Sequence, residues 1–152
     1  MIRKILALAA VAVFSQTVAA APLAEVEYLP GYEVEPVRRL VQILDSGEVR
    51  VTTQNYRTGE QTTRLLAELA VPVVATLAGT IDGLERREMV DLDAGRPECV
   101  DAPVIVTRFY QSGSRRPWPV FKQQSCHEYA ISQWRARPVR RLLQGFLDLD
   151  RL

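Results

Sequence analysis

Residues 138–148 read PVRRLLQGFLD and carry the clearest helical pattern of the chain. The apolar side chains of this segment recur at helical spacing and form one face: Val139, Leu142, Leu143, Phe146 and Leu147. Pro138 is tolerated here because the first turn of a helix does not need its backbone N–H. The segment therefore predicts an amphipathic helix that buries this face against a sheet.

A similar segment lies 66 positions earlier, where residues 72–82 read PVVATLAGTID. The matched pairs are Pro72 and Pro138, Val73 and Val139, Leu77 and Leu143, Gly79 and Gly145, and Asp82 and Asp148. The turn signals Ser46-Gly47 and Ser112-Gly113 keep the same offset. This register predicts two equivalent halves, about 37–84 and 103–149, whether by duplication or by convergence. We expect both matched leucines to be buried and both matched glycines to lie close to the sheet.

Turn residues separate the predicted strands. Asp45-Ser46-Gly47 divides residues 37–44 from an alternating segment that follows it, which indicates a hairpin. A second turn at Thr58-Gly59 leads to a third strand over residues 61–66. Residues 103–110 are the most strand-like run of the chain. The prolines of Pro117-Trp118-Pro119 interrupt the return strand and predict that it lies at a sheet edge.

These patterns predict an α+β fold. One antiparallel sheet is built from two hairpin-plus-helix (ββα-like) halves, and both helices pack on one face. Residues 37–152 form a single domain in this interpretation. Residues 21–36 are acidic and contain three prolines and a glycine, so they predict an irregular acidic N-terminal arm.

Residues 1–20 have the features of a secretory signal peptide. Arg3 and Lys4 precede an uncharged apolar core over residues 5–14, and small residues lead to a cleavage point after Ala20. A retained membrane anchor is the alternative. No later apolar run approaches the ~20 residues that span a bilayer, so we expect no transmembrane segment in the mature chain. The sequence predicts an exported protein, periplasmic or secreted.

Charge divides the mature chain into unlike halves. Residues 21–101 carry 15 acidic and 8 basic residues, a net charge of −7, whereas residues 102–152 carry 3 acidic and 9 basic residues, a net charge of +6. Almost all the mature basic residues are arginines, which can grip a carboxylate or phosphate with two hydrogen bonds.

Cys99 and Cys126 are the only cysteines, 27 positions apart. In an exported chain an even count favours a disulfide. The alternative is a reactive Cys126 beside His127, but adjacent residues of an extended segment point to opposite faces. Cys99 precedes one strand and Cys126 follows its partner, so antiparallel pairing brings them to a Cα separation of about 5.5 Å.

The chain is poor in the residues of most catalytic sites. His127 is the only histidine, and there is no nucleophile motif or phosphate-binding glycine loop. One histidine and two bridged cysteines cannot hold zinc, and we expect no cofactor or metal. The tightest acidic cluster lies in a loop: Asp91, Asp93, Glu98 and Asp101. It leaves a carboxylate-based hydrolase open as an alternative.

The basic half offers a candidate binding surface instead. Arg115, Arg116 and Trp118 lie in or beside a hairpin tip, while Trp134 and Arg140 mark a second basic cluster at the start of the last helix. Arginine and tryptophan dominate binding hot spots. The competing interpretation is that Trp118 covers the edge of the core and the arginines are solvated. Export makes nucleic acid an unsuitable partner.

The sequence is thus best interpreted as an exported binding or inhibitor-type protein, with binding favoured over catalysis. Its partner would be another envelope or extracellular protein or an anionic envelope component. The alternatives are the carboxylate-based hydrolase and a structural factor in envelope assembly.

Overall fold

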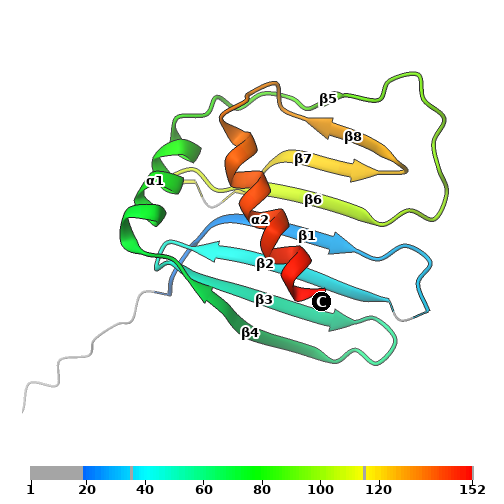
Figure 1. Cartoon of the computed structure of the whole chain (residues 1–152), viewed down its shortest axis with the longest axis horizontal. Coiled ribbons are helices and arrows are strands. Elements are labelled where there is room, and N and C mark those ends of the chain that lie inside the picture. The colour runs from blue at the N-terminus through cyan, green and yellow to red at the C-terminus, as the bar shows by residue number, and fades with distance from the viewer. Residues whose placement is uncertain (1–18, 35, 115, 152) are drawn as a thin grey trace, which may run out of the picture.

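The computed structural model describes residues 19–34, 36–114 and 116–151. Within these ranges, eight strands form one antiparallel sheet in the order β4-β3-β2-β1-β6-β7-β8-β5, and two helices pack against it (Figure 1). The strands are β1 (Pro22–Leu29), β2 (Val37–Leu44), β3 (Glu48–Asn55), β4 (Gln61–Glu68), β5 (Val90–Asp91), β6 (Val104–Phe109), β7 (Trp118–Gln124) and β8 (His127–Ala130). The helices are α1 (Val71–Asp82) and α2 (Ala136–Asp150). The α+β fold is confirmed. Residues 1–18 of the predicted signal peptide lie outside the described part of the chain.

The predicted irregular arm over residues 21–36 is wrong for Pro22–Leu29, which forms strand β1 at the centre of the sheet. β1 pairs with β2 on one side and with β6 on the other. Apolar and acidic residues alternate along β1, as successive side chains of a strand point to opposite faces of the sheet. Ala24, Val26 and Tyr28 face the core, and Glu25 and Glu27 face the other way. The prolines stand at the ends of the strand, where no ladder hydrogen bond is lost.

Helix α2 covers the apolar face of the central strands. It crosses the sheet over β1 and β2, while α1 stands at one end of the strands (Figure 1). Val139, Leu143 and Leu147 are its buried stripe, as the sequence predicts. At the far end of α2, Asp150 forms ion pairs with Arg39 of β2 and Arg64 of β4, which fix the helix across the sheet.

The two halves are equivalent in order of elements but not in depth of burial. Leu143 is fully buried, whereas Leu77 of α1 is only half-buried against the same core. A methyl group added at Gly79 or Gly145 would meet open space, so the expectation that both glycines lie close to the sheet is wrong. Helix α1 buries only Ile81 completely.

The β7 strand does not lie at a sheet edge, contrary to the expectation from its prolines. It pairs with β6 over most of its length and with β8 over residues 121–124. Pro119 is tolerated for two reasons. The register with β6 shifts between Thr107 and Arg108, and the ladder with β8 does not reach Pro119, so its missing N–H breaks no bond on that side.

Two turns require unusual backbone conformations. Gly47 closes the β2–β3 hairpin at φ 93°, and a Cβ there would lie 2.6 Å from the Leu69 carbonyl oxygen. The β7–β8 hairpin turns through Ser125 and Cys126, whose φ angles are 51° and 66°. Positive φ at both central residues is the geometry of a two-residue hairpin turn that follows the twist of the strands.

Candidate binding site

The structure separates the five residues predicted to bind a partner. Arg115 lies outside the described residues. Arg116 is exposed beside it, and Trp118 is buried with only 6% of its surface exposed. Trp134 is 70% exposed, and Arg140 is half-buried on α2. The last two come together in one pocket, whereas the hairpin tip forms a separate surface.

Of the two interpretations of Trp118, its burial supports the one in which it covers the core, and not the one in which it anchors a partner at an exposed hairpin tip. Trp118 belongs to the hydrophobic core, and its Nε1 donates to the Arg87 carbonyl at 3.4 Å. Hydrogen bonds hold the β6–β7 turn against the end of α1. Gln111 donates to the Leu84 carbonyl at 2.7 Å. Ser112 donates to Asp82 from its backbone and its hydroxyl, and these bonds hold the pKa of Asp82 below its ordinary value.

A pocket of about 570 Å³ lies between the start of α2 and strands β5 and β8, and we call it the arginine groove. Its cationic and aromatic side chains are Trp134, Arg137, Arg140 and Arg141. Apolar residues from the core and from the edge of the sheet also line it: Val90, Leu92, Val120, Ala130, Ile131 and Ala136. One carboxylate, that of Glu128, and the polar side chains of Ser132 and Gln133 make up the rest of the lining. Three large apolar side chains on it are exposed, since Val90 is 49% exposed, Leu92 56% and Trp134 70%.

Arg140 is the least exposed cation of the groove. Its guanidinium carbon lies 4.3 Å from the centroid of the Phe121 ring, within the range of a cation–π contact. Burial lowers the pKa of Arg140; the charge of Glu128 opposes this, and those of Arg137 and Arg141 add to it. Arginine remains protonated in any protein, so the groove holds a partly desolvated positive charge.

The three arginines of the groove outnumber the one carboxylate that lines it, that of Glu128. In the described part of the chain, none of Arg137, Arg140 and Arg141 forms an ion pair, and the first turn of α2 carries no acidic residue. The positive end of the helix dipole lies at the same place. This concentration of positive charge costs folding free energy and favours an anion from outside.

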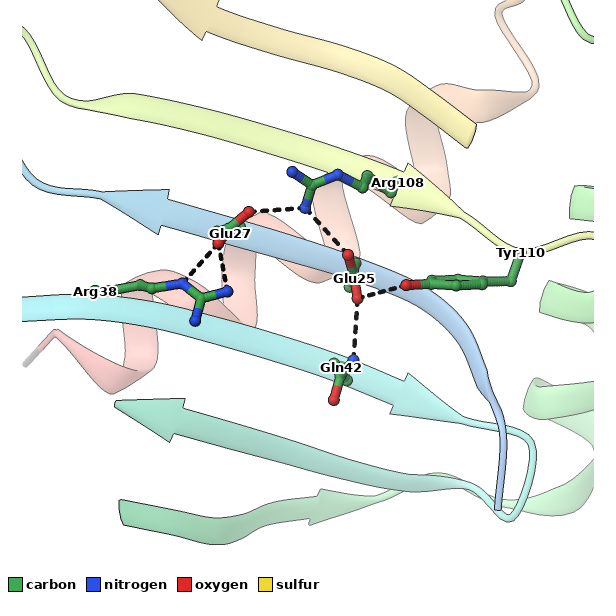
Figure 2. A network of polar contacts seen from close by, with 6 residues as sticks. All are labelled: Glu25, Glu27, Arg38, Gln42, Arg108 and Tyr110. Carbon is green, nitrogen blue, oxygen red and sulfur yellow. Dashed lines mark hydrogen bonds and ion pairs between the residues drawn. The ribbon is translucent and has the colours of Figure 1, made fainter. Parts of the chain in front are cut away.

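A second polar cluster lies on the opposite face of the sheet, and Figure 2 shows its six residues: Glu25, Glu27, Arg38, Gln42, Arg108 and Tyr110. Arg108 Nη1 bridges the two carboxylates of β1, at 3.1 Å from Glu25 and 2.8 Å from Glu27. Arg38 donates from Nε and Nη2 to Glu27 at 2.6 Å. Tyr110 and Gln42 donate to Glu25 at 2.9 and 3.0 Å.

This cluster is satisfied internally, and the carboxylate of Glu27 is held as an ion. Burial by itself raises the pKa of Glu27, but the hydrogen bonds and charges of Arg108 and Arg38 outweigh it and hold the pKa below its ordinary 4.5. Burial and the charge of Glu25 raise the pKa of Tyr110, so its hydroxyl stays a donor. Two carboxylates balanced by two guanidiniums suit a structural role better than proton transfer.

The acidic loop proposed for hydrolysis uses its carboxylates to hold its own shape. Asp91 accepts from the Asp93 backbone at 2.9 Å, and Asp93 accepts from the Glu128 backbone at 3.0 Å. Asp93 also pairs with Arg96 at 2.7 Å. No group of three or more potential metal-ligating side chains is present among the described residues. Asp91 and Asp93 are therefore engaged within the loop and with β8.

The Cys99–Cys126 disulfide joins this loop to the β7–β8 turn. The Cα atoms are 5.6 Å apart, which confirms the predicted pairing. Because Cys126 is held in this bridge, the alternative of a free, reactive Cys126 is wrong. The neighbouring His127 is buried and contacts Asp91. No local pattern signals the His127–Asp91 contact, because the two residues lie 36 positions apart and meet through the β5–β8 pairing.

Among the described residues, neither helix combines the length and the apolar composition that crossing a bilayer requires. The disulfide fits an extracytoplasmic protein. Comparisons of the chain with protein-family models, with curated proteins and with solved structures find no match.

Proposed function

We propose that this chain is an exported binding protein that holds an acidic segment of another extracytoplasmic protein in the arginine groove. The observation that carries the proposal is the set of arginines around one pocket, Arg137, Arg140 and Arg141, without an ion pair in the described residues. Such arginines attract carboxylates. Arg140 is half-buried, which strengthens the attraction at that position, whereas Arg137 and Arg141 are exposed.

The exposed apolar residues of the groove favour a protein partner. Trp134, Leu92 and Val90 offer contact area beside the charges, and a tryptophan next to arginines is the composition of a binding hot spot. A segment that alternates carboxylates with apolar side chains would match both features. Asp91 and Asp93 are engaged in holding the 91–101 loop, so binding explains the groove better than hydrolysis does.

The test measures binding of synthetic peptides to the mature protein by fluorescence anisotropy. The peptides alternate Glu or Asp with Leu, Val or Phe, and each has a counterpart with Lys in place of the acids. We expect the acidic peptides alone to bind. The affinity should fall steeply with added salt, because the attraction is between exposed charges.

The matched variants are Arg137→Gln with Arg141→Gln in the groove, and Arg57→Gln as control. Arg57 is exposed at the β3–β4 turn, away from the groove. The groove variant should lose about tenfold or more in affinity, roughly 1.4 kcal/mol, and the control should not. Equal binding of acidic and basic peptides, or no effect of the groove variant, would contradict the proposal.

A further inference from the structure

The imidazole of the buried His127 lies between two acceptors. Its Nδ1 is 3.1 Å from Asp91 Oδ2, and its Nε2 is 3.0 Å from the Arg96 carbonyl oxygen. A carboxylate and a carbonyl both accept hydrogen bonds and donate none. Both ring nitrogens must therefore carry a proton for both contacts to be hydrogen bonds, and only the imidazolium form has two N–H groups.

Loss of one proton breaks this arrangement. The neutral ring keeps a single N–H, so the other nitrogen turns a lone pair toward an acceptor at hydrogen-bond distance. The contact that was attractive becomes repulsive at a ring that is itself buried. We call His127, Asp91 and the Arg96 carbonyl the histidine latch.

The latch holds one wall of the arginine groove. Val90 and Leu92 flank Asp91 directly, and both line the groove together with Glu128, the residue after His127. The Leu92 backbone N–H donates to the Glu128 carbonyl at 2.8 Å. The β5 strand has only two residues, Val90 and Asp91, so its ladder with β8 is short. Another hydrogen bond that joins this wall to β8 runs from the Glu128 backbone N–H to Asp93 at 3.0 Å.

We propose that the histidine latch makes the arginine groove proton-dependent: protonated His127 holds the Val90–Leu92 wall in place, and partner binding weakens when His127 loses its proton. This proposal rests on the binding function proposed above. It assigns to the single histidine a regulatory role at the edge of the site, without contact with the partner.

The charges around His127 all favour its protonated form. Asp91 on β5 accepts from it, and the carboxylate of Glu98 on the following loop adds a second negative charge nearby. The guanidinium of Arg96 is directed to Asp93, and the neighbouring aromatic group, Tyr129, stacks at 6.3 Å between ring centroids. The hydrogen bond to Asp91 raises the pKa of His127; burial opposes this, and the charges of Asp91 and Glu98 and the bond to the Arg96 carbonyl add to it.

The direction of the pH dependence follows from the raised pKa of His127. The latch is complete below the ordinary histidine pKa of 6.5 and is lost as the pH rises through the higher value of the folded protein. Carboxylates of a peptide partner stay ionised throughout this window, because their pKa values lie near 4. A loss of affinity on the alkaline side would thus come from the protein.

The experiment follows the latch and the groove separately in the mature protein. Because His127 is the only histidine, the NMR signals of its ring report one pKa without ambiguity. The hydrogen-exchange protection of the Leu92 amide reports the wall. Affinity for an acidic peptide, measured between about pH 6 and pH 9, reports binding. The variant is Asp91→Asn, which keeps the shape and removes the charge; the control is Asp101→Asn, an exposed residue of the same loop.

We expect His127 to titrate above 6.5, and the Leu92 protection and the peptide affinity to fall over the same pH range. Asp91→Asn should move all three midpoints to lower pH, and Asp101→Asn should move none. A His127 pKa at or below 6.5, or a peptide affinity that stays constant while His127 titrates, would overturn the latch. If the Leu92 amide loses protection as His127 titrates but no peptide binds at any pH, the proposed function fails and the latch stands.

Discussion

Arg108 of β6 donates from a single nitrogen, Nη1, to the carboxylates of both Glu25 and Glu27 on the neighbouring strand β1. The side chains of both glutamates are less than a tenth exposed. One guanidinium thus supports two buried negative charges at the centre of the sheet, and Arg38 supports only one of them.

Removal of Arg108 should destabilise the protein strongly. In Arg108→Met both carboxylates lose a partner while they stay buried, and breaking a buried pair from one side costs about 3–5 kcal/mol. Urea unfolding of the mature protein measures this loss. Arg50→Met is the control, because Arg50 pairs with Glu48 on the surface and such pairs contribute about 0–1 kcal/mol. Similar losses in the two variants would show that the bridge is not important for stability.

Stability should fall with acid because of Glu27. Its pKa in the folded protein lies below the ordinary 4.5, so the carboxylate contributes stability that is fully present above pH 4.5 and is lost as the pH falls through the folded value. Unfolding free energies measured from pH 6 downward should therefore decrease below about pH 4.5. Glu27→Gln should be less stable at pH 6 and show a flatter acid limb. A variant curve parallel to that of the wild type would contradict this assignment.

The two tryptophans should have opposite effects. Trp118→Ala removes a core side chain and should cost about 3–5 kcal/mol of stability. Trp134→Ala removes an exposed side chain, so the unfolding free energy should change by less than about 0.5 kcal/mol while peptide affinity falls. Urea unfolding and anisotropy measure the two effects. A Trp134→Ala variant that binds acidic peptides as tightly as the wild type would remove this residue from the groove's function.

The disulfide should stabilise the loop that carries the groove wall. Replacement of both Cys99 and Cys126 by Ser should cost roughly 3 kcal/mol in the loop-entropy model. The non-reduced mature protein should lack two hydrogens by mass spectrometry, and two free thiols in protein isolated from its compartment would contradict the pairing. If the bridge supports the wall, the Leu92 amide should also exchange faster in the double variant.

Local signals in the sequence were enough for most elements. Turn residues such as Ser46-Gly47 restrict the backbone within a few positions, and helical spacing identifies the buried stripe of α2 from Val139 to Leu147. The disulfide could be predicted because antiparallel pairing brings the ends of β6 and β7 together. Each of these features depends on neighbours in the chain or on a single hairpin.

The same kind of signal was present in β1 but outweighed by composition. Ala24, Val26 and Tyr28 alternate with acidic residues, which is the period of a strand. The surrounding prolines and the acidic composition nevertheless favoured an irregular surface segment. What makes the acids acceptable is Arg108, 83 positions away from Glu25. No local pattern reports such a partner, so the central place of β1 depends on tertiary pairing.

By itself, then, the sequence determined the β2–β3 and β6–β7 hairpins, the two helices, the disulfide and the basic character of the C-terminal half, because these follow from spacing and composition. Only the tertiary structure decided which arginines and which tryptophan meet in a pocket. Trp118 and Trp134 look alike in sequence, but the pairing of β7 inside the sheet buries the first, whereas the second stays exposed at the groove. The groove combines α2 with β5 and β8, and the latch joins residues 36 positions apart, because burial and long-range contacts are set by packing and not by neighbours in the chain.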